Sequence, residues 1–178
     1  MSIVTTYLET FAPPQGPLVP LPAGATVMRA APPTASFYRW LYHAVGSPWG
    51  WTDRNRLDDR ALTMLITPEN VSVQVLYVHG TPAGYAELAY GPFDGTDVVA
   101  GGEAQLVYFG LMPHAIGQGL GRAFLDGIVR EAFAHGVRRL WVHTCSLDHP
   151  RALGAYRAAG FEVYGEESPD SASPRHPL

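Results

Sequence analysis

The sequence predicts a mixed α/β domain, and two patterns carry that prediction. Residues 71–78 (VSVQVLYV) and 83–90 (AGYAELAY) are strand-like runs separated by the turn sequence HGTP, which is typical of an antiparallel hairpin. Residues 103–145 instead run strand, helix, strand, an order that joins parallel strands through a right-handed crossover. The length of 178 residues suits one domain with a full hydrophobic core.

The first half of the chain supplies three further elements. A short strand is expected over 25–30, and a helix over 34–45, where apolar residues recur at helical spacing. A second helix is expected over 57–66, with Asp58 or Asp59 near its start.

The second half follows a regular order. We expect a strand over 103–112, a helix over about 119–135, a strand over 138–145, a last helix that Gly160 ends, and a final strand with the sequence FEVYG. Asp148 or His149 is expected to cap the last helix, with Pro150 in its first turn.

Proline marks both ends of the chain. Residues 1–24 contain APPQGPLVPLPAG, which disfavours helix and inner strand, so we expect a proline-rich extension, laid over the domain. Residues 166–178 are polar and proline-rich and predict a flexible tail. The domain itself is therefore expected over 25–165.

Composition excludes several classes of protein. Apolar residues make up 47% of the chain and charged residues 16%, which indicates a globular protein. The formal net charge is −4, so the basic surface of a nucleic-acid binder is not expected. With one cysteine, no membrane-length apolar run and no pattern of a secretory signal, we expect a cytoplasmic protein without membrane partners.

Three alternating glycines, Gly117, Gly119 and Gly121, precede the long helix. The start of a helix presents unpaired N–H groups and the positive end of a dipole, and glycine lets an anion approach that backbone closely. A phosphate site is therefore one interpretation, and a tight turn that needs glycine for its geometry alone is the other. A P-loop is excluded because the chain contains no lysine, and the spacing is wrong for a dinucleotide fingerprint.

Two motifs, and the order in which they follow the strands and helices, resemble those of the GNAT superfamily of acyl-CoA-dependent N-acyltransferases. The first, [RQ]-x-x-G-x-[GA] after a strand, corresponds to residues 116–121. The second, roughly N-x-x-A-x-x-x-Y-x-x-x-GF, corresponds to His149, Ala152, Tyr156, Gly160 and Phe161. The sequence departs from the pattern at Ile116, where Arg or Gln is usual, and at His149, where Asn is common.

The resemblance implies a fold and a cosubstrate. The fold is a mixed, mostly antiparallel central sheet with a splayed parallel strand pair, flanked by helices, and the cosubstrate is acetyl-CoA. The pantetheine arm would pair with Phe109, Gly110 and Leu111. The pyrophosphate would lie on the main chain of Gly117, Gln118, Gly119, Leu120, Gly121 and Arg122, with His149 as a further contact.

The resemblance also implies catalytic roles. Tyr156 is the candidate acid that protonates the leaving thiolate, although a core tyrosine bonded to the backbone is the alternative. Many relatives carry a Glu where this chain has Gln105, which cannot act as a base. Glu87, which interrupts an apolar strand, and Glu103 are the candidate bases, and for either residue a solvated strand end is the alternative.

The acceptor site is expected around the first helix and the loop that follows it. Tyr38, Tyr42, Trp49, Trp51 and Asp53 would form an aromatic wall with one carboxylate, or the rings simply close the edge of the core. No metal site is expected, because strand alternation explains His143 and Cys145.

The sequence thus predicts an N-acetyltransferase that transfers an acetyl group from acetyl-CoA to a primary amine on a small molecule or peptide. The alternative is a non-catalytic acyl-CoA-binding sensor or regulatory module. The oligomeric state is open, and a homodimer is compatible with the sequence.

Overall fold

The structure, a computed structural model, describes residues 3–91 and 102–168. Parts of the loop after residue 90 and most of the tail expected over 166–178 lie outside these residues. Within them, a seven-stranded sheet has the order β2-β3-β4-β5-β6-β1-β7. The expected mixed sheet is confirmed, because β5 and β6 run parallel and the other neighbouring strands run antiparallel.

The strands and helices lie close to the expected ranges. The strands are β1 (Thr5–Thr10), β2 (Ala25–Ala30), β3 (Val71–Val78), β4 (Thr81–Tyr90), β5 (Glu103–Leu111), β6 (Arg139–Cys145) and β7 (Glu162–Glu167). The α-helices are α1 (Ala35–Gly46), α2 (Asp59–Ile66), α3 (Leu120–Ala134) and α4 (Ala152–Ala158). Thr34 caps α1 and Asp58 caps α2, each through a side-chain oxygen that accepts a backbone N–H.

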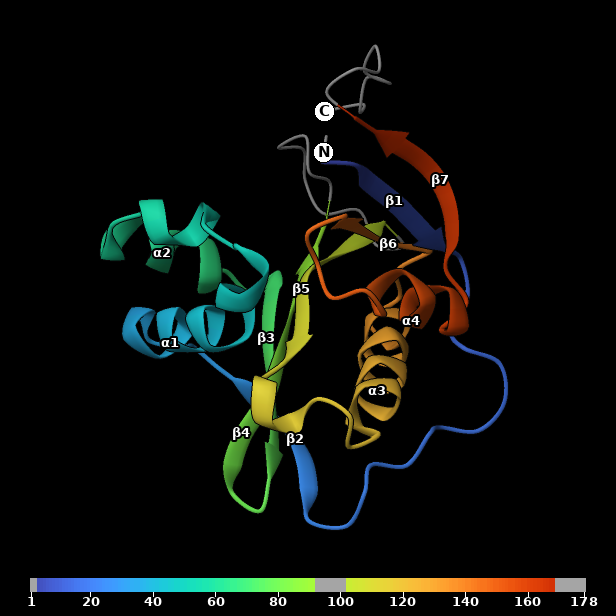
Figure 1. The fold of residues 1–178 in the computed structure, drawn as a ribbon, viewed down its shortest axis with the longest axis horizontal. Helices are drawn as coiled ribbons and strands as arrows, with labels where there is room; N and C mark the ends of the chain where they lie inside the picture. The colour runs from blue at the N-terminus through green and yellow to red at the C-terminus, as the bar shows by residue number, and fades with distance from the viewer. Residues whose placement is uncertain (1–2, 92–101, 169–178) are drawn as a thin grey trace.

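Helices cover both faces of the sheet: α1 and α2 lie on one side, α3 and α4 on the other (Figure 1). Each side has its own apolar core, one that includes Leu41, Leu62 and Val75, and one that includes Leu106, Phe124 and Val142. The fully buried side chains of this second core hold α3 against β5 and β6. The orientation of the start of α3 relative to the two parallel strands follows from this packing.

The first strand corrects the expectation for the N-terminus. Thr5–Thr10 pairs with β6 on one side and β7 on the other, so this part of the expected extension lies inside the sheet. Thr6, Leu8 and Thr10 alternate inward, and two of these three buried residues are threonines. Because the alternation contains only one large apolar residue and leads directly into prolines, the strand carried little hydrophobic signal.

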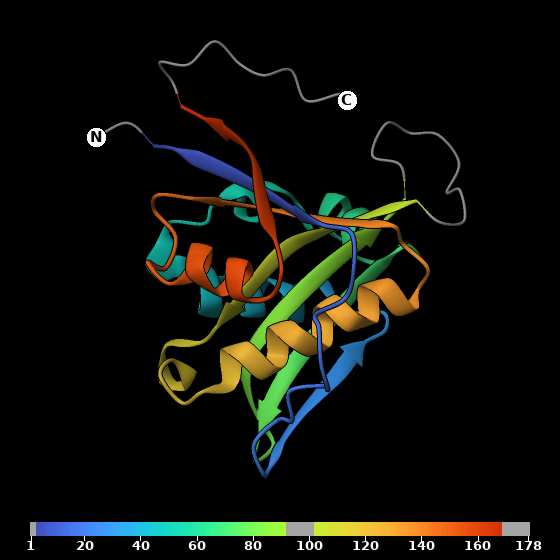
Figure 2. The ribbon, with the colours of Figure 1, turned by 90° about the vertical axis from the view of Figure 1, so that its right-hand side faces the viewer.

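Residues 11–24, called the strap below, do lie over the domain. Figure 2 shows the strap crossing the outer side of α3 before it enters β2. The N–H of Val19 donates to Asp126 (3.1 Å), and Arg130 donates to the carbonyls of Pro14 (3.0 Å) and Gly16 (2.9 Å). A side-chain pair on α3 therefore fixes an irregular segment through its backbone.

The start of α4 also differs from the expectation. The helix begins at Ala152, and its N-cap residue, Arg151, makes no side-chain cap. Asp148 instead accepts from Thr144 and from the N–H of Cys145, while His149 accepts from the N–H of Arg151. Asp148 and His149 therefore stabilise the turn after β6 and do not cap the helix. No helix of the described segments is long and apolar enough to cross a membrane.

Candidate functional site

Two parallel strands separate at the centre of the sheet. β5 and β6 pair only at their beginnings, from Glu103 opposite Arg139 to Gln105 opposite Trp141. β5 also shifts register against β4 between the partners of Glu87 and Leu88. Such an irregularity increases the local bend of a strand, which fits the separation that begins at the same level.

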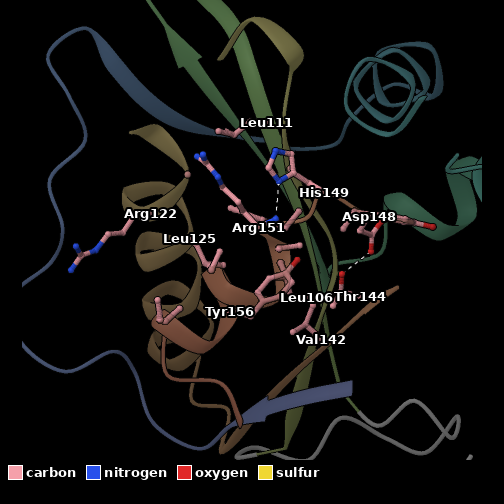
Figure 3. A pocket seen from close by; sticks show the side chains of 18 of the residues that line it. Leu106, Leu111, Arg122, Leu125, Val142, Thr144, Asp148, His149, Arg151 and Tyr156 are labelled. Carbon is pink, nitrogen blue, oxygen red and sulfur yellow. Dashed lines mark hydrogen bonds between the residues drawn. The ribbon is translucent and has the colours of Figure 1, made fainter. Parts of the chain in front are cut away.

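A cavity of about 1350 Å³ occupies the gap (Figure 3). Its walls include Leu106–Leu111 of β5 and Val142–Cys145 of β6. Phe109, Gly110 and Leu111 pair with β4, but on the side facing β6 their backbone has no strand partner among the described residues. An extended chain that contains amide groups can add to such an edge by hydrogen bonding.

The start of α3 forms one end of the cavity. Gly117 and Gly119 adopt left-handed backbone conformations (φ 86° and 77°), which glycine favours. A Cβ atom at either position would meet no atom within 4 Å, so the space in front of this backbone is open. No side chain caps the helix at Gly119, and the cavity lining includes Gly121 and Arg122. The arrangement suits an anion, which would face free N–H groups and the positive end of the helix dipole.

Two residues of the expected cradle do not line the cavity. The side chain of Gln118 donates to the carbonyl of His114 (2.7 Å), and Leu120 is buried in the core. The sequence-based expectation concerned their main-chain N–H groups.

Tyr156 lies in the wall of the cavity, on α4. Its ring is buried and packs edge-on against Phe109 and Phe161, with centroid distances of 6.3 and 5.9 Å. The hydroxyl makes no hydrogen bond to any residue that the structure describes. Desolvation raises the pKa of Tyr156 above its ordinary value, and the negative charge of Asp148 raises it further. The phenol is therefore protonated at neutral pH.

Aromatic residues of the loop after α1 form the opposite end. Trp49, Trp51 and Asp53 line the cavity. The Trp51 ring lies 5.0 Å from that of Tyr108, and Trp49 lies 5.0 Å from His149. Through its indole N–H, Trp51 donates to Asp148 (3.1 Å), which connects this loop to the turn after β6.

Tyr38 and Tyr42 do not reach the cavity. Both side chains are buried in the core between α1 and the sheet, where their rings are 6.4 Å apart. The core alternative therefore describes these two rings better than a role in the acceptor wall.

Glu87 is buried behind the cavity wall. Arg54 binds one of its carboxylate oxygens at 2.8 Å, and the hydroxyl of Tyr38 donates to the other. Desolvation raises the pKa of Glu87, and the guanidinium of Arg54 opposes that effect. The guanidinium of Arg54 also lies 5.3 Å from the centroid of the Tyr108 ring, which lines the cavity. Glu87 thus anchors Arg54 and, through it, the loop that carries Trp49 and Trp51.

Glu103 lies away from the cavity, at the start of β5. Its carboxylate binds Arg139 at 2.5 Å, and Arg139 also binds Glu9 at 2.6 Å. Neither of the two carboxylates expected from the sequence lines the cavity. The geometry therefore does not support direct proton transfer from the acceptor to Glu87 or Glu103.

Sequence reasoning did not select two side chains that the structure places in or next to the cavity wall. Asp148 lines the cavity but appeared in the sequence only as a candidate helix cap, and Arg54 carried no motif. The strap residues Pro17 and Leu18 also line the cavity. Among the described residues, no group of three or more His, Cys, Asp or Glu side chains is placed to hold a metal ion.

Residues 34–161 match the model of the acetyltransferase (GNAT) family, a range that covers both motifs and both ends of the cavity. A sequence search of curated proteins finds no match.

Solved structures share the fold at low sequence identity. A GCN5-related N-acetyltransferase from Sphaerobacter thermophilus superposes with a TM-score of 0.64 at 18% identity, covering 94% of this chain and 50% of that chain. A tandem GNAT protein from the clavulanic acid biosynthesis pathway gives 0.66 at 15% identity, with 94% and 52% covered. The chain thus spans about half the length of these two proteins. An aminoglycoside acetyltransferase from an uncultured soil metagenomic sample gives 0.61 at 15% identity, with 78% and 89% covered.

Proposed function

Because the chain belongs to the GNAT acetyltransferase family, we propose that it transfers an acetyl group from acetyl-CoA to a primary amine. One observation carries the proposal: a single cavity joins the unpaired edge of β5, the uncapped start of α3 and the hydroxyl of Tyr156. These three features suit the three parts of the cosubstrate, which are an amide-containing arm, a diphosphate and a thioester.

The cosubstrate would be held mainly by backbone. The N–H groups of residues 117–122 would bind the diphosphate, and open space in front of Gly117 and Gly119 leaves room for it. Phe109, Gly110 and Leu111 would pair with the pantetheine amides. Because binding at residue 116 would use the main chain, isoleucine is compatible with it in place of the usual Arg or Gln. Arg122 and His149 line the same cavity and would add side-chain contacts.

In the proposed reaction, the neutral amine nitrogen forms a bond to the thioester carbonyl carbon and the carbon–sulfur bond breaks. Tyr156 gives its proton to the departing thiolate. After attack, the nitrogen loses a proton that restores the phenol, so the products are the amide and the free thiol. Deprotonating a lysine-like amine at pH 7 requires roughly 4–5 kcal/mol, because its pKa is about 10.4. Because neither Glu87 nor Glu103 lines the cavity, we propose that water takes the proton that the ammonium loses before attack.

The acceptor would bind against Trp49, Trp51 and Asp53. The soil enzyme with a similar fold is an aminoglycoside acetyltransferase and has been solved with sisomicin. This likeness is one reason to test small-molecule amines first.

The test is release of free thiol from acetyl-CoA in the presence of a panel of primary amines, with mass spectrometry of the acetylated product. The second candidate function is a non-catalytic acyl-CoA sensor. One observation favours it: neither Glu87 nor Glu103 lines the cavity. Binding of CoA without thiol release across the whole panel would favour the sensor.

The dependence of the rate on pH follows from these assignments. With an alkylamine acceptor, kcat/KM is expected to rise about tenfold per pH unit between pH 7 and 9, as the neutral amine becomes more abundant. Tyr156 acts in its protonated form, and its raised pKa keeps it protonated at higher pH than an ordinary tyrosine. We therefore expect no decrease of kcat/KM with rising pH at any pH up to about 10. Initial rates across pH check this. A falling limb near pH 8 would contradict the assignment of Tyr156.

A further inference from the structure

Asp148 holds a carboxylate on the cavity wall in a fixed position. Its Oδ1 accepts from the indole N–H of Trp51 (3.1 Å). Its Oδ2 accepts from the hydroxyl of Thr144 and from the N–H of Cys145, both at 2.8 Å. The three donors come from the loop after α1, from β6 and from the end of β6, so the group cannot turn without breaking several bonds.

The charge of this carboxylate has no counter-ion among the residues that the structure describes. Asp148 takes part in none of the ion pairs among the described residues, whereas Asp126, another acidic residue of the cavity lining, is bound to Arg130. The donors to Asp148 are all neutral. A carboxylate has about four acceptor sites, of which three are filled here, and the remaining one is on Oδ1. A partly buried negative charge with a free acceptor site favours a cationic ligand.

The group lies between the aromatic wall and the proposed acid. In Figure 3 the hydroxyl of Tyr156 points toward the side of the cavity where Thr144 and Asp148 lie. The same carboxylate raises the pKa of Tyr156, which supports its proximity to the phenol. Trp51, bonded to Asp148, presents its ring to the cavity beside Tyr108.

We propose that Asp148 receives the positively charged nitrogen of the acceptor, and that the acceptor is a cationic primary amine whose flat or apolar group lies against Trp49 and Trp51. Aromatic faces attract a nearby ammonium as well, so the wall and the carboxylate act in the same direction. As a role in transfer, this rests on the proposed function, but binding of the amine does not require acetyl-CoA.

The carboxylate also suits the reaction. When a neutral amine attacks the thioester carbonyl, its nitrogen becomes positively charged before it loses a proton. A fixed negative charge beside that nitrogen stabilises the charge that develops during attack. Asp148 therefore matches both the ammonium that enters the site and the nitrogen as it forms the new bond.

The test uses the indole N–H of Trp51 as a reporter, since it is bonded to the proposed binding group. Its cross-peak in a ¹H–¹⁵N spectrum can be assigned with the variant Trp51→Phe. The free protein is titrated with 2-phenylethylamine and, separately, with 2-phenylethanol, its uncharged counterpart. We expect the amine to move the Trp51 peak and to bind about tenfold more tightly than the alcohol, the effect of one charge-assisted hydrogen bond.

Two variants locate the effect. In Asp148→Asn the preference for the amine is expected to disappear, because asparagine keeps an acceptor oxygen but carries no charge. Asp59→Asn removes one carboxylate from an exposed pair with Arg39 on α2, outside the cavity, and should keep the preference.

Equal affinities of the wild type for the two ligands, no movement of the Trp51 peak with either, or a preference that persists in Asp148→Asn would overturn the proposal. The wild-type comparison needs no variant, so it remains decisive if Asp148→Asn does not fold. Amine binding at Trp51 without thiol release from acetyl-CoA would count against the proposed transfer and not against the amine site.

Discussion

Replacing Tyr156 by phenylalanine is expected to lower kcat by about 10²–10⁴-fold, the usual range for loss of a positioned general acid. Phenylalanine keeps the ring contacts with Phe109 and Phe161, so the fold and the cavity wall should persist. The hydroxyl has no protein partner among the described residues, and its removal therefore leaves no buried group unsatisfied. Steady-state kinetics with an accepted amine, together with calorimetric titration of CoA, measures both quantities.

The affinity for CoA separates a catalytic role of Tyr156 from a structural one. We expect the dissociation constant of CoA to change by less than about twofold, a difference below 0.5 kcal/mol. Tyr164→Phe is the matched control, because Tyr164 lies on β7 and does not line the cavity. An unchanged kcat in Tyr156→Phe, or an equal loss in Tyr164→Phe, would show that the hydroxyl of Tyr156 is not the acid.

Replacing Gly121 by glutamate is expected to weaken CoA binding on the order of 10²-fold without weakening the fold. A Cβ atom at Gly121 would meet only Leu111, at an ordinary contact distance of 3.6 Å. In the first turn of α3 a glutamate is favoured over glycine by about 0.5–1 kcal/mol, through helix propensity and the helix dipole. The same charge would repel a diphosphate at the N–H groups by roughly 2–3 kcal/mol.

Opposite effects on stability and binding make this prediction specific. Thermal unfolding should show an unchanged or raised Tm, while titration of CoA shows the loss. Gly121→Ala adds a side chain without charge and serves as the control. S-acetylpantetheine, which lacks phosphate, should interact equally with all three proteins. Unchanged affinity of Gly121→Glu for CoA would mean that no phosphate lies at this helix.

Local patterns predicted most of the fold because the elements follow simple periodicities. Val71–Val78 and Ala25–Ala30 have the expected bounds, since β-branched alternation and nearby turn residues define them. The long helix α3 was expected one residue longer at each end, because Gly119 and Gly136 mark its limits in sequence. GNAT-like architecture followed from the order of elements and two motifs, which the family match confirms.

The remaining features depend on contacts between distant segments. β1 is a strand because β6 and β7 offer edges on both sides, and its sequence of alternating threonines carries little sign of that. Tyr38 and Tyr42 share a helix with the acceptor end, but their direction toward the core follows from packing of α1 on the sheet. From the local sequence, Asp148 is a candidate helix cap. Its hydrogen bond with Trp51, 97 residues away in the chain, depends on the fold.

We propose that the gap between β5 and β6 holds the arm of acetyl-CoA, with its diphosphate on the start of α3. A ¹H–¹⁵N spectrum of the full chain, recorded during titration with CoA, tests it most directly. We expect the largest shifts at the amides of Gly117–Arg122 and of Phe109–Leu111. Saturable shifts confined to other surfaces, or no shifts at millimolar CoA, would contradict it.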